Sequence, residues 1–177
     1  QCRFEPILAP NPPSPGPASV VYEELFETPS ALASWTFGSE GVNGEYRPQS
    51  WRHTTELPAG RAGGALLAVN SSAIGNCVVG SDDQSGLVRA ESPVIQLPDS
   101  AWSALLVIDH YLATEPGWDG GNLKLSVNGG AFEIVPTTAF RFNHYNASVI
   151  SSLEVDGRVT TNSNPLAGEP AFTGVDQ

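Results

Sequence analysis

Acidic side chains are the first candidates for chemistry in this sequence. They occur together at 23–27, in a Gly/Ser-rich loop at 82–83 and in the loop 114–121. Calcium binds six to eight oxygens from carboxylates, carbonyls and water, and loops at strand ends present such oxygens readily. No cluster has EF-hand spacing. We predict one structural calcium ion, with Glu27, Glu115 and Asp119 as candidate ligands.

Each acidic cluster also has a simpler interpretation. Asp82 and Asp83 have the character of a solvated surface, because charged side chains are mostly exposed. Asp119 precedes a glycine, and an aspartate at this position of a turn often hydrogen-bonds its own backbone. These alternatives stay open at the level of sequence.

Aromatic side chains suggest a second kind of site. The chain has 4 Trp and 4 Tyr, and aromatic faces pack well against the apolar face of a sugar ring. Most tryptophans of small β-sandwiches are buried in the core, but Trp118 follows Pro116 and Gly117 in a loop. Trp118 and Tyr111 are therefore the predicted ligand-binding residues if the partner is a polysaccharide.

The sequence does not predict an enzyme. The short motifs of zinc proteases, serine hydrolases, nucleotide-binding loops and redox pairs are absent. His53, His110 and His144 could gather with a carboxylate as a zinc site or a triad, and Asp109 with Glu115 could form a glycosidase pair. His53 and His110 are better explained as hydrogen-bonded residues of strands.

Charge and hydropathy exclude two classes of partner. With 8 Lys and Arg against 19 Asp and Glu, the formal net charge is −11. Nucleic acid binding needs a basic surface that releases counterions, so we expect no nucleic acid partner. The apolar stretch 104–108 is far shorter than the roughly 20 residues of a membrane span, so we expect no membrane insertion.

The two cysteines and the N-terminal prolines lead to predictions about a disulfide and about the N-terminal arm. Cys2 and Cys77 are far apart, which favours one disulfide over a metal or redox pair, with free thiols or a partner in another chain as alternatives. The sequence starts at Gln1, which allows a signal peptide to have been removed. Residues 1–19 contain six prolines and are predicted to form an extended arm or linker, followed by one domain at 20–177.

After the arm, short apolar alternations separated by Gly, Pro, Asn and Asp predict an all-β domain. A hairpin with a tight Asn128-Gly129 turn is expected between two of the strands. Apolar residues occupy both parities of 104–112, which is typical of a central strand covered on both sides. The predicted strands are 20–27, 50–55, 65–69, 87–97, 103–113, 122–127 and 131–135.

Several blocks in a fixed order carry a family resemblance. They are 24–27, 51–55, 92–98, 108–111, 114–121, 126–130 and 164–174. With them the chain resembles the MAM-like jelly-roll modules of secreted bacterial proteins, often called choice-of-anchor J domains. These modules are similar to the accessory domains of immune-inhibitor-A-type and fungalysin-type metalloproteases. The resemblance runs from about residue 20 to the end of the sequence.

The resemblance implies an extracellular or cell-surface, two-sheet antiparallel jelly-roll sandwich without catalysis of its own. It also implies calcium held by the opening acid, matched by Glu27, together with the acid before the paired glycines, matched by Asp119. Family members continue past the block 164–174 with further strands that end in an Asp-Asp pair. This sequence stops at Gln177, before any such closing strands or closing Asp-Asp pair.

A jelly roll without its closing strands has an unpaired edge, which is a template for another chain. The arm residues Phe4, Ile7 and Leu8 are predicted to form an interface that completes an identical subunit, so that repetition builds a filament. Prolines weaken a strand made by this arm, because each removes a ladder donor. We expect a module for protein–protein adhesion or assembly; the alternative is a carbohydrate-binding accessory domain of a secreted hydrolase.

Overall fold

The computed structural model describes residues 19–68 and 84–176, and this part of the chain is all-β apart from short 3-10 turns. An all-β fold was predicted and is confirmed. The elements in chain order are η1 (Pro29–Ser34), β1 (Thr36–Gly41), β2 (Trp51–Thr54), β3 (Ala65–Ala68), β4 (Gly86–Glu91), β5 (Leu112–Ala113), β6 (Lys124–Leu125), β7 (Glu133–Ile134), η3 (Thr137–Ala139), β8 (Ala147–Ser148), β9 (Ser152–Val155), β10 (Arg158–Thr161), β11 (Pro170–Ala171) and β12 (Val175–Asp176).

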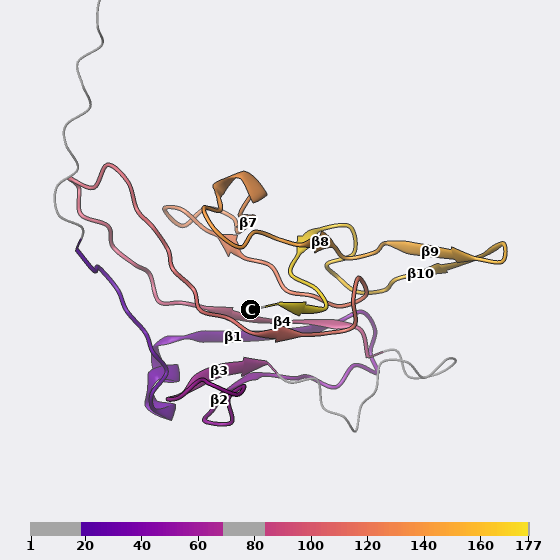
Figure 1. Ribbon diagram of the computed structural model, residues 1–177, viewed down its shortest axis with the longest axis horizontal. Coiled ribbons are helices and arrows are strands. Elements are labelled where there is room, and N and C mark those ends of the chain that lie inside the picture. Colours follow the sequence, from indigo (N-terminus) through magenta and orange to yellow (C-terminus); the bar gives the residue numbers. More distant parts are fainter. Residues whose placement is uncertain (1–18, 69–83, 177) are drawn as a thin grey trace, which may run out of the picture.

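The described strands associate in antiparallel pairs. β1 pairs with β4, β2 with β3, β5 with β12, β6 with β7, β8 with β11 and β9 with β10. β1 and β4 make the longest of these ladders, and β2 and β3 lie next to them (Figure 1). Because each described sheet has two strands, the two larger sheets expected of a jelly roll are not seen in this part of the chain.

The hairpin predicted around Asn128-Gly129 is confirmed. Asn128 and Gly129 have φ angles of 53° and 75°, which is the backbone that a tight hairpin turn between twisted strands requires. The Gly130 N–H donates to the Val127 carbonyl at 3.0 Å, and the Val135 N–H donates to the Leu123 carbonyl at 2.9 Å. β2 and β3 likewise lie within the predicted strands 50–55 and 65–69.

Three predicted strands are wrong or much too long, and the predicted hairpin strands 122–127 and 131–135 are shortened to two residues each in β6 and β7. Residues 20–27 form no strand, and β4 stops at Glu91 instead of reaching residue 97. The next residue but one is Pro93, which has no N–H to donate to a ladder. Of the predicted strand 103–113, only β5 is paired, because β12 reaches no further than Leu112.

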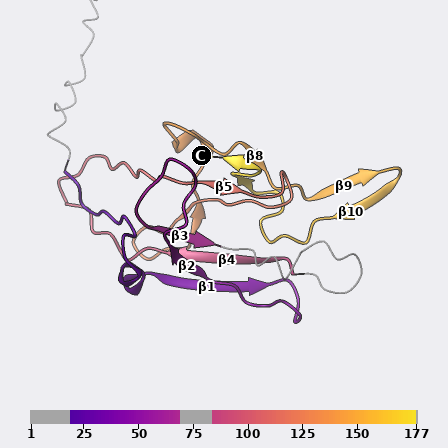
Figure 2. The same cartoon turned by 60° about the horizontal axis from the view of Figure 1, so that its bottom comes forward.

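Several strands were not predicted. β9 and β10 form a hairpin whose turn, Asp156-Gly157, has φ angles of 51° and 74°. This is the same turn chemistry as in the β6–β7 hairpin. The β9–β10 hairpin projects away from the other labelled strands in both ribbon views (Figures 1 and 2). β1 was missed because its sequence, with two glycines, carries little strand preference without its partner β4.

The buried apolar side chains come from the C-terminal third of the described chain. We call Tyr145, Val149, Leu166, Ala171 and Phe172 the packed corner, since all are at most 7% exposed. The Phe172 ring is the centre of an aromatic cluster, with its centroid 5.0 Å from that of Tyr145 and 6.0 Å from that of Phe140. The packed corner holds the ends of β8 and β11 together.

Candidate functional site

Residues 103–111 carry exposed apolar side chains and lie outside the strands of the part of the chain that the structure describes. We call this segment the open edge. The exposed fractions of Leu105, Leu106 and Val107 are 63%, 68% and 80%. A contiguous exposed apolar patch on a soluble protein marks an interaction site or an aggregation hazard.

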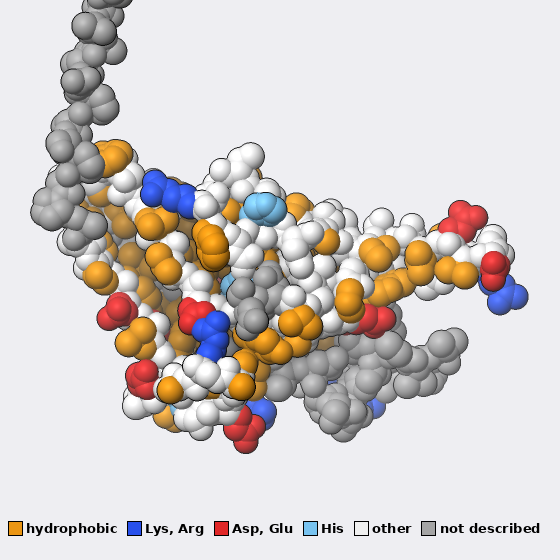
Figure 3. Space-filling view, in the orientation of Figure 1, with side chains coloured by type: hydrophobic (Ala, Val, Ile, Leu, Met, Phe, Trp, Pro, Cys, Tyr) orange, Lys and Arg blue, Asp and Glu red, His pale blue; other side chains and the backbone are white. Residues whose placement is uncertain are grey.

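The chain reaches the open edge through an extended excursion from β4. Residues 92–97 run outward as a first arm, and the open edge returns toward β5 as a second arm. Between them the Ala101 N–H donates to the Pro98 carbonyl at 2.8 Å, which closes a turn. Both ribbon views show the two arms projecting from the labelled strands (Figures 1 and 2), and hydrophobic side chains lie open in the same area of the surface (Figure 3).

The C-terminal end of the open edge is held in place. Asp109 forms an ion pair with Arg61, and the hydrogen bond from Arg61 lowers the pKa of the Asp109 carboxyl. The His110 ring packs on the ring of Phe172 with centroids 4.6 Å apart. Immediately afterwards β5 pairs with β12, with Leu112 opposite Asp176. The open edge is therefore positioned by the packed corner although it has no ladder of its own.

A hydrogen-bonded turn follows β5 and contains two of the predicted calcium ligands, Glu115 and Asp119. The buried hydroxyl of Thr173 accepts from the Gly117 N–H at 2.7 Å and donates to the Asp119 carbonyl at 2.6 Å. The side-chain amide of Asn146 binds the backbone of Thr173 twice. Its N–H donates to the Thr173 carbonyl at 2.8 Å, and its oxygen accepts from the Thr173 N–H at 2.9 Å. These contacts fix the backbone of the turn against β8 and β12.

The carboxylate of Asp119 is affected by its surroundings in this turn. Burial, reinforced by the nearby charge of Glu115, raises the pKa of the Asp119 carboxyl. The Asn164 side-chain N–H donates to Asp119 Oδ1 at 3.3 Å and opposes that shift. A cation beside both carboxylates would favour their charged forms.

The third predicted ligand, Glu27, lies elsewhere. A Cβ atom built on Gly63 would lie 2.7 Å from Glu27 Oε1, so this carboxylate lies against the loop that precedes β3. Within residues 19–68 and 84–176, no three His, Cys, Asp or Glu side chains come close enough to hold one metal ion. The described residues therefore do not form a complete calcium site, and calcium stays a prediction.

The predicted sugar-binding residues do not form a platform in the described part. Tyr111 is 48% exposed at the end of the open edge, and Trp118 is half-buried in the turn after β5. None of the ring pairs found among the described residues includes either side chain. Two hollows of the described surface lie on the β9–β10 hairpin and along 52–56, and neither is lined by these two side chains. Carbohydrate binding stays a prediction.

The three histidines lie in different surroundings. His53 is on β2, where its Nε2 is buried without a hydrogen-bond partner, contrary to the prediction that it would be bonded. His110 packs on Phe172, and His144 Nδ1 lies 2.8 Å from the Tyr145 carbonyl. The Asp109 carboxylate forms an ion pair with Arg61.

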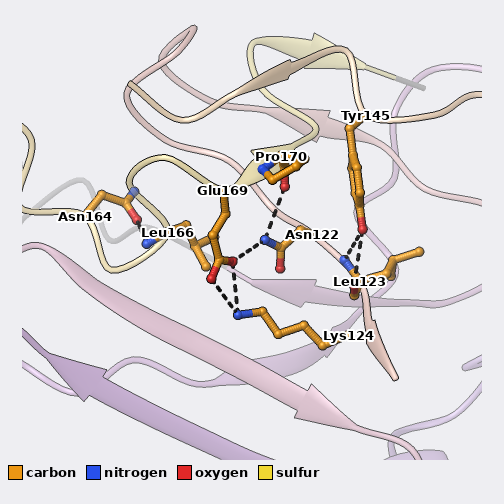
Figure 4. Close-up of polar contacts among 8 residues, drawn as sticks. All are labelled: Asn122, Leu123, Lys124, Tyr145, Asn164, Leu166, Glu169 and Pro170. Carbon is orange, nitrogen blue, oxygen red and sulfur yellow. Dashed lines mark hydrogen bonds and ion pairs between the residues drawn. The ribbon is translucent and has the colours of Figure 1, made fainter. Parts of the chain in front are cut away.

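Sequence reasoning missed a polar network between the β6–β7 hairpin and β11. The Glu169 carboxylate accepts from Asn122 Nδ2 at 2.7 Å and from Lys124 Nζ at 3.0 Å, and the Tyr145 hydroxyl contacts both the N–H and the carbonyl of Leu123 at 3.1 Å (Figure 4). Nothing in the sequence marked these residues, since their partners are about 20 to 50 positions away.

Other predictions concern residues outside the described part of the chain. These are the disulfide between Cys2 and Cys77, the interface residues Phe4, Ile7 and Leu8, and the acidic pair Asp82 and Asp83. The described residues contain no helix with the length and apolar character that a membrane span requires. Comparison of the chain with family models, curated proteins and solved structures finds no match.

Proposed function

We propose that this chain is a non-catalytic extracellular β-sandwich module that acts by protein–protein association, and that its open edge is completed by a second copy of the chain. The observation that carries the proposal is the open edge itself. It is an exposed apolar segment that is continuous with the paired strand β5 and lies outside the strands of the described residues. Segments of this kind take up strands from other chains.

The chemistry of the open edge favours an apolar peptide partner. Of its side chains only that of Asp109 is formally charged, and Arg61 of the same chain already pairs with it. Leu106, Val107 and Ile108 fall at its centre. A second copy running antiparallel therefore brings apolar side chains against apolar side chains, which is how cross-strand pairs stabilise a sheet.

The family resemblance supports the remaining parts of the proposal. The MAM-like modules that the sequence resembles are jelly rolls of secreted proteins. An extracellular location and a role in adhesion or in a surface assembly follow from this resemblance. A structural calcium ion, with Glu115 and Asp119 among its ligands, belongs to the same proposal.

The proposal is tested by measuring the association state of the purified chain over a wide range of concentration. Sedimentation velocity is expected to show reversible self-association of the unaltered protein. Val107→Lys is expected to abolish it, because lysine on an edge strand blocks pairing. Val159→Lys is the matched control. Val159 is also exposed, at 65%, but lies on β10, which already pairs with β9 of the same chain.

Two results would contradict the proposal. One is a protein that remains monomeric at every concentration. The other is an equal loss of association in the Val107→Lys and Val159→Lys variants, which would show that general solubility rather than the open edge decides. Circular dichroism of both variants establishes that each retains its β structure.

A further inference from the structure

The sequence contains two Asn-Gly pairs, Asn43-Gly44 and Asn128-Gly129, and the structure places their asparagines in different surroundings. We infer that Asn128 is a site of spontaneous deamidation in the folded protein, that Asn43 is protected from it, and that the isoaspartate product loosens the β6–β7 hairpin. Asparagine is a chemically labile residue, and a following glycine has no side chain to hinder the reaction. The inference is independent of the proposed function, because it concerns the chemistry of one turn.

The reaction needs only water and the groups of the turn. The Gly129 backbone nitrogen loses its proton to solvent and attacks Asn128 Cγ. The Cγ–Nδ2 bond breaks, and Nδ2 takes up a proton and leaves as ammonia. Water then opens the cyclic imide that remains. Attack of water at the Cγ carbonyl gives aspartate, and attack at the backbone carbonyl gives isoaspartate, in which the chain runs through Cγ. No group is oxidised or reduced.

Both reacting groups of the Asn128-Gly129 turn are accessible. The two residues are exposed, and among the residues that the structure describes the Asn128 side chain has no hydrogen-bond partner. The turn is closed by the Gly130 N–H, which donates to the Val127 carbonyl at 3.0 Å. A turn bond of this kind joins the first and fourth residues and does not use the N–H of the third, here Gly129. A Cβ built on Gly129 would meet no atom within 4 Å, so the tip has room to rotate toward the geometry of attack.

Asn43 is held in a way that Asn128 is not. Its Oδ1 accepts from the Glu45 N–H at 2.9 Å, and its backbone carbonyl accepts from the Tyr46 N–H at 3.4 Å. Attack by the Gly44 nitrogen requires the side-chain amide of Asn43 to turn its face toward that nitrogen, which breaks the bond to Glu45. The free energy of that hydrogen bond is therefore added to the barrier at Asn43 and not at Asn128.

The two products differ in how they fit the hairpin. The β9–β10 hairpin has an aspartate at the equivalent position, and Asp156 and Gly157 have φ angles of 51° and 74°, against 53° and 75° for Asn128 and Gly129. An aspartate is therefore compatible with this turn. Isoaspartate adds one methylene to the backbone, and the length of a hairpin loop fixes the register of its strands. The isoaspartate product is thus the one that disturbs β6 and β7.

A disturbance of this hairpin reaches the packed corner. Lys124 of β6 contacts the Glu169 carboxylate, and the Leu123 backbone contacts the Tyr145 hydroxyl (Figure 4). Both contacts depend on the position of the strand, because Lys124 lies opposite Ile134 in the ladder. Isoaspartate at position 128 is therefore expected to weaken the attachment of the hairpin to Tyr145 and to the chain before β11.

Ageing of the full chain at mildly alkaline pH tests the site. Peptide mapping by mass spectrometry measures deamidation at each asparagine, and an isoaspartate-specific methyltransferase measures the isoaspartate. In the native protein we expect deamidation on the order of five-fold faster at Asn128 than at Asn43, the factor that one hydrogen bond supplies. In urea the two rates are expected to converge, since both sites are then Asn-Gly pairs in an unfolded chain.

A second measurement tests the effect on the hairpin. The aged protein is separated by ion exchange, and the Tm of its isoaspartate fraction is compared with that of a freshly prepared Asn128→Asp variant, which carries the same charge on an ordinary backbone. Asn128→Asp is expected to unfold close to the unaltered protein, and the isoaspartate fraction at a lower temperature.

The outcomes separate the site from its effect. Equal rates at Asn43 and Asn128 in the native protein, or a faster reaction at Asn43, overturn the assignment of the site. Deamidation of both asparagines in urea and of neither in the folded chain overturns it as well, since the turn then protects Asn128. If Asn128 reacts as expected but the isoaspartate fraction keeps the Tm of Asn128→Asp, the site stands and the loosening of the hairpin is refuted.

Discussion

Val149 and Val107 are the same residue in two opposite environments. Val149, in the packed corner, is 1% exposed, whereas Val107, in the open edge, is 80% exposed. Burying a valine side chain contributes about 1.5 kcal/mol or more, and Val107 does not realise this contribution within the described part of the chain. What differs is the availability of a partner strand.

The packed corner shows what the open edge lacks. Val149 exchanges backbone hydrogen bonds with residues close to β11, donating to the Glu169 carbonyl at 3.0 Å and accepting from Gly168 at 2.8 Å. The open edge has an adjoining ladder at one end only, where β5 meets β12. Burial in this protein therefore depends on pairing between segments distant in sequence, and an unpaired segment stays exposed however apolar it is.

The largest expected effect is that of Phe172→Ala. Phe172 is 7% exposed and its ring contacts those of His110, Phe140 and Tyr145. Replacing a buried phenylalanine by alanine lowers the free energy of unfolding by about 3–5 kcal/mol. Urea denaturation of the variant measures this loss. Phe142→Ala, at a ring that is 90% exposed, is the control and is expected to change stability by at most about 0.5 kcal/mol. Similar losses in both variants would show that the packed corner does not stabilise the fold.

The next effect compares the two valines directly. Val149→Ala is expected to cost about 1–3 kcal/mol, from two lost methyl groups and the cavity they leave. Val107→Ala is expected to change the stability of the monomer by less than about 0.5 kcal/mol. Urea denaturation at a dilution where the protein is monomeric measures both. A large loss for Val107→Ala would mean that the open edge is buried in solution within a single chain.

The smallest effect compares the aspartates of the two regions. The raised pKa of Asp119 means that the folded chain keeps this proton to higher pH than the unfolded chain, so ionisation costs stability as pH rises through the folded pKa. Asp119→Asn keeps an Oδ1 acceptor for Asn164, and is expected to raise the Tm at neutral pH and to have little effect below the unfolded pKa of about 3.9.

Asp109→Asn should have the opposite sign. The pKa of Asp109 is lowered by Arg61, so its contribution is present above the unfolded pKa and is lost as pH falls through the folded pKa. The effect is small because the ion pair is exposed to solvent. Thermal unfolding of both variants from pH 3 to 8 measures the difference. Equal signs at neutral pH would contradict the distinction between the two sites.

Sequence predicted those elements that local chemistry determines. The turn at Asn128-Gly129 forms as expected because the two residues tolerate positive φ angles whatever the rest of the chain does. The Asp156-Gly157 turn carries the same signal, with Leu153, Val155 and Val159 beside it, but polar residues around it masked the pattern.

Sequence failed where structure depends on distant partners. Residues 103–111 have the composition of a strand, but composition does not supply the ladder that makes one. The same holds for the candidate site. Asp119 and Glu115 are brought together by their own turn, whereas Glu27, far away in sequence, lies against Gly63. The hydrogen bonds of Thr173 and Asn146 could not be foreseen for the same reason.

The pairing of β5 with β12 also governs how the chain folds during its synthesis. Leu112 and Ala113 emerge from the ribosome about 60 residues before Val175 and Asp176, their ladder partners. At about 5–20 residues per second this interval lasts roughly 3–12 s, and pairings so distant in sequence form slowly in any case. Throughout this interval the strand that follows Leu105, Leu106 and Val107 has no ladder partner, so this apolar segment is open to chaperone binding on the growing polypeptide.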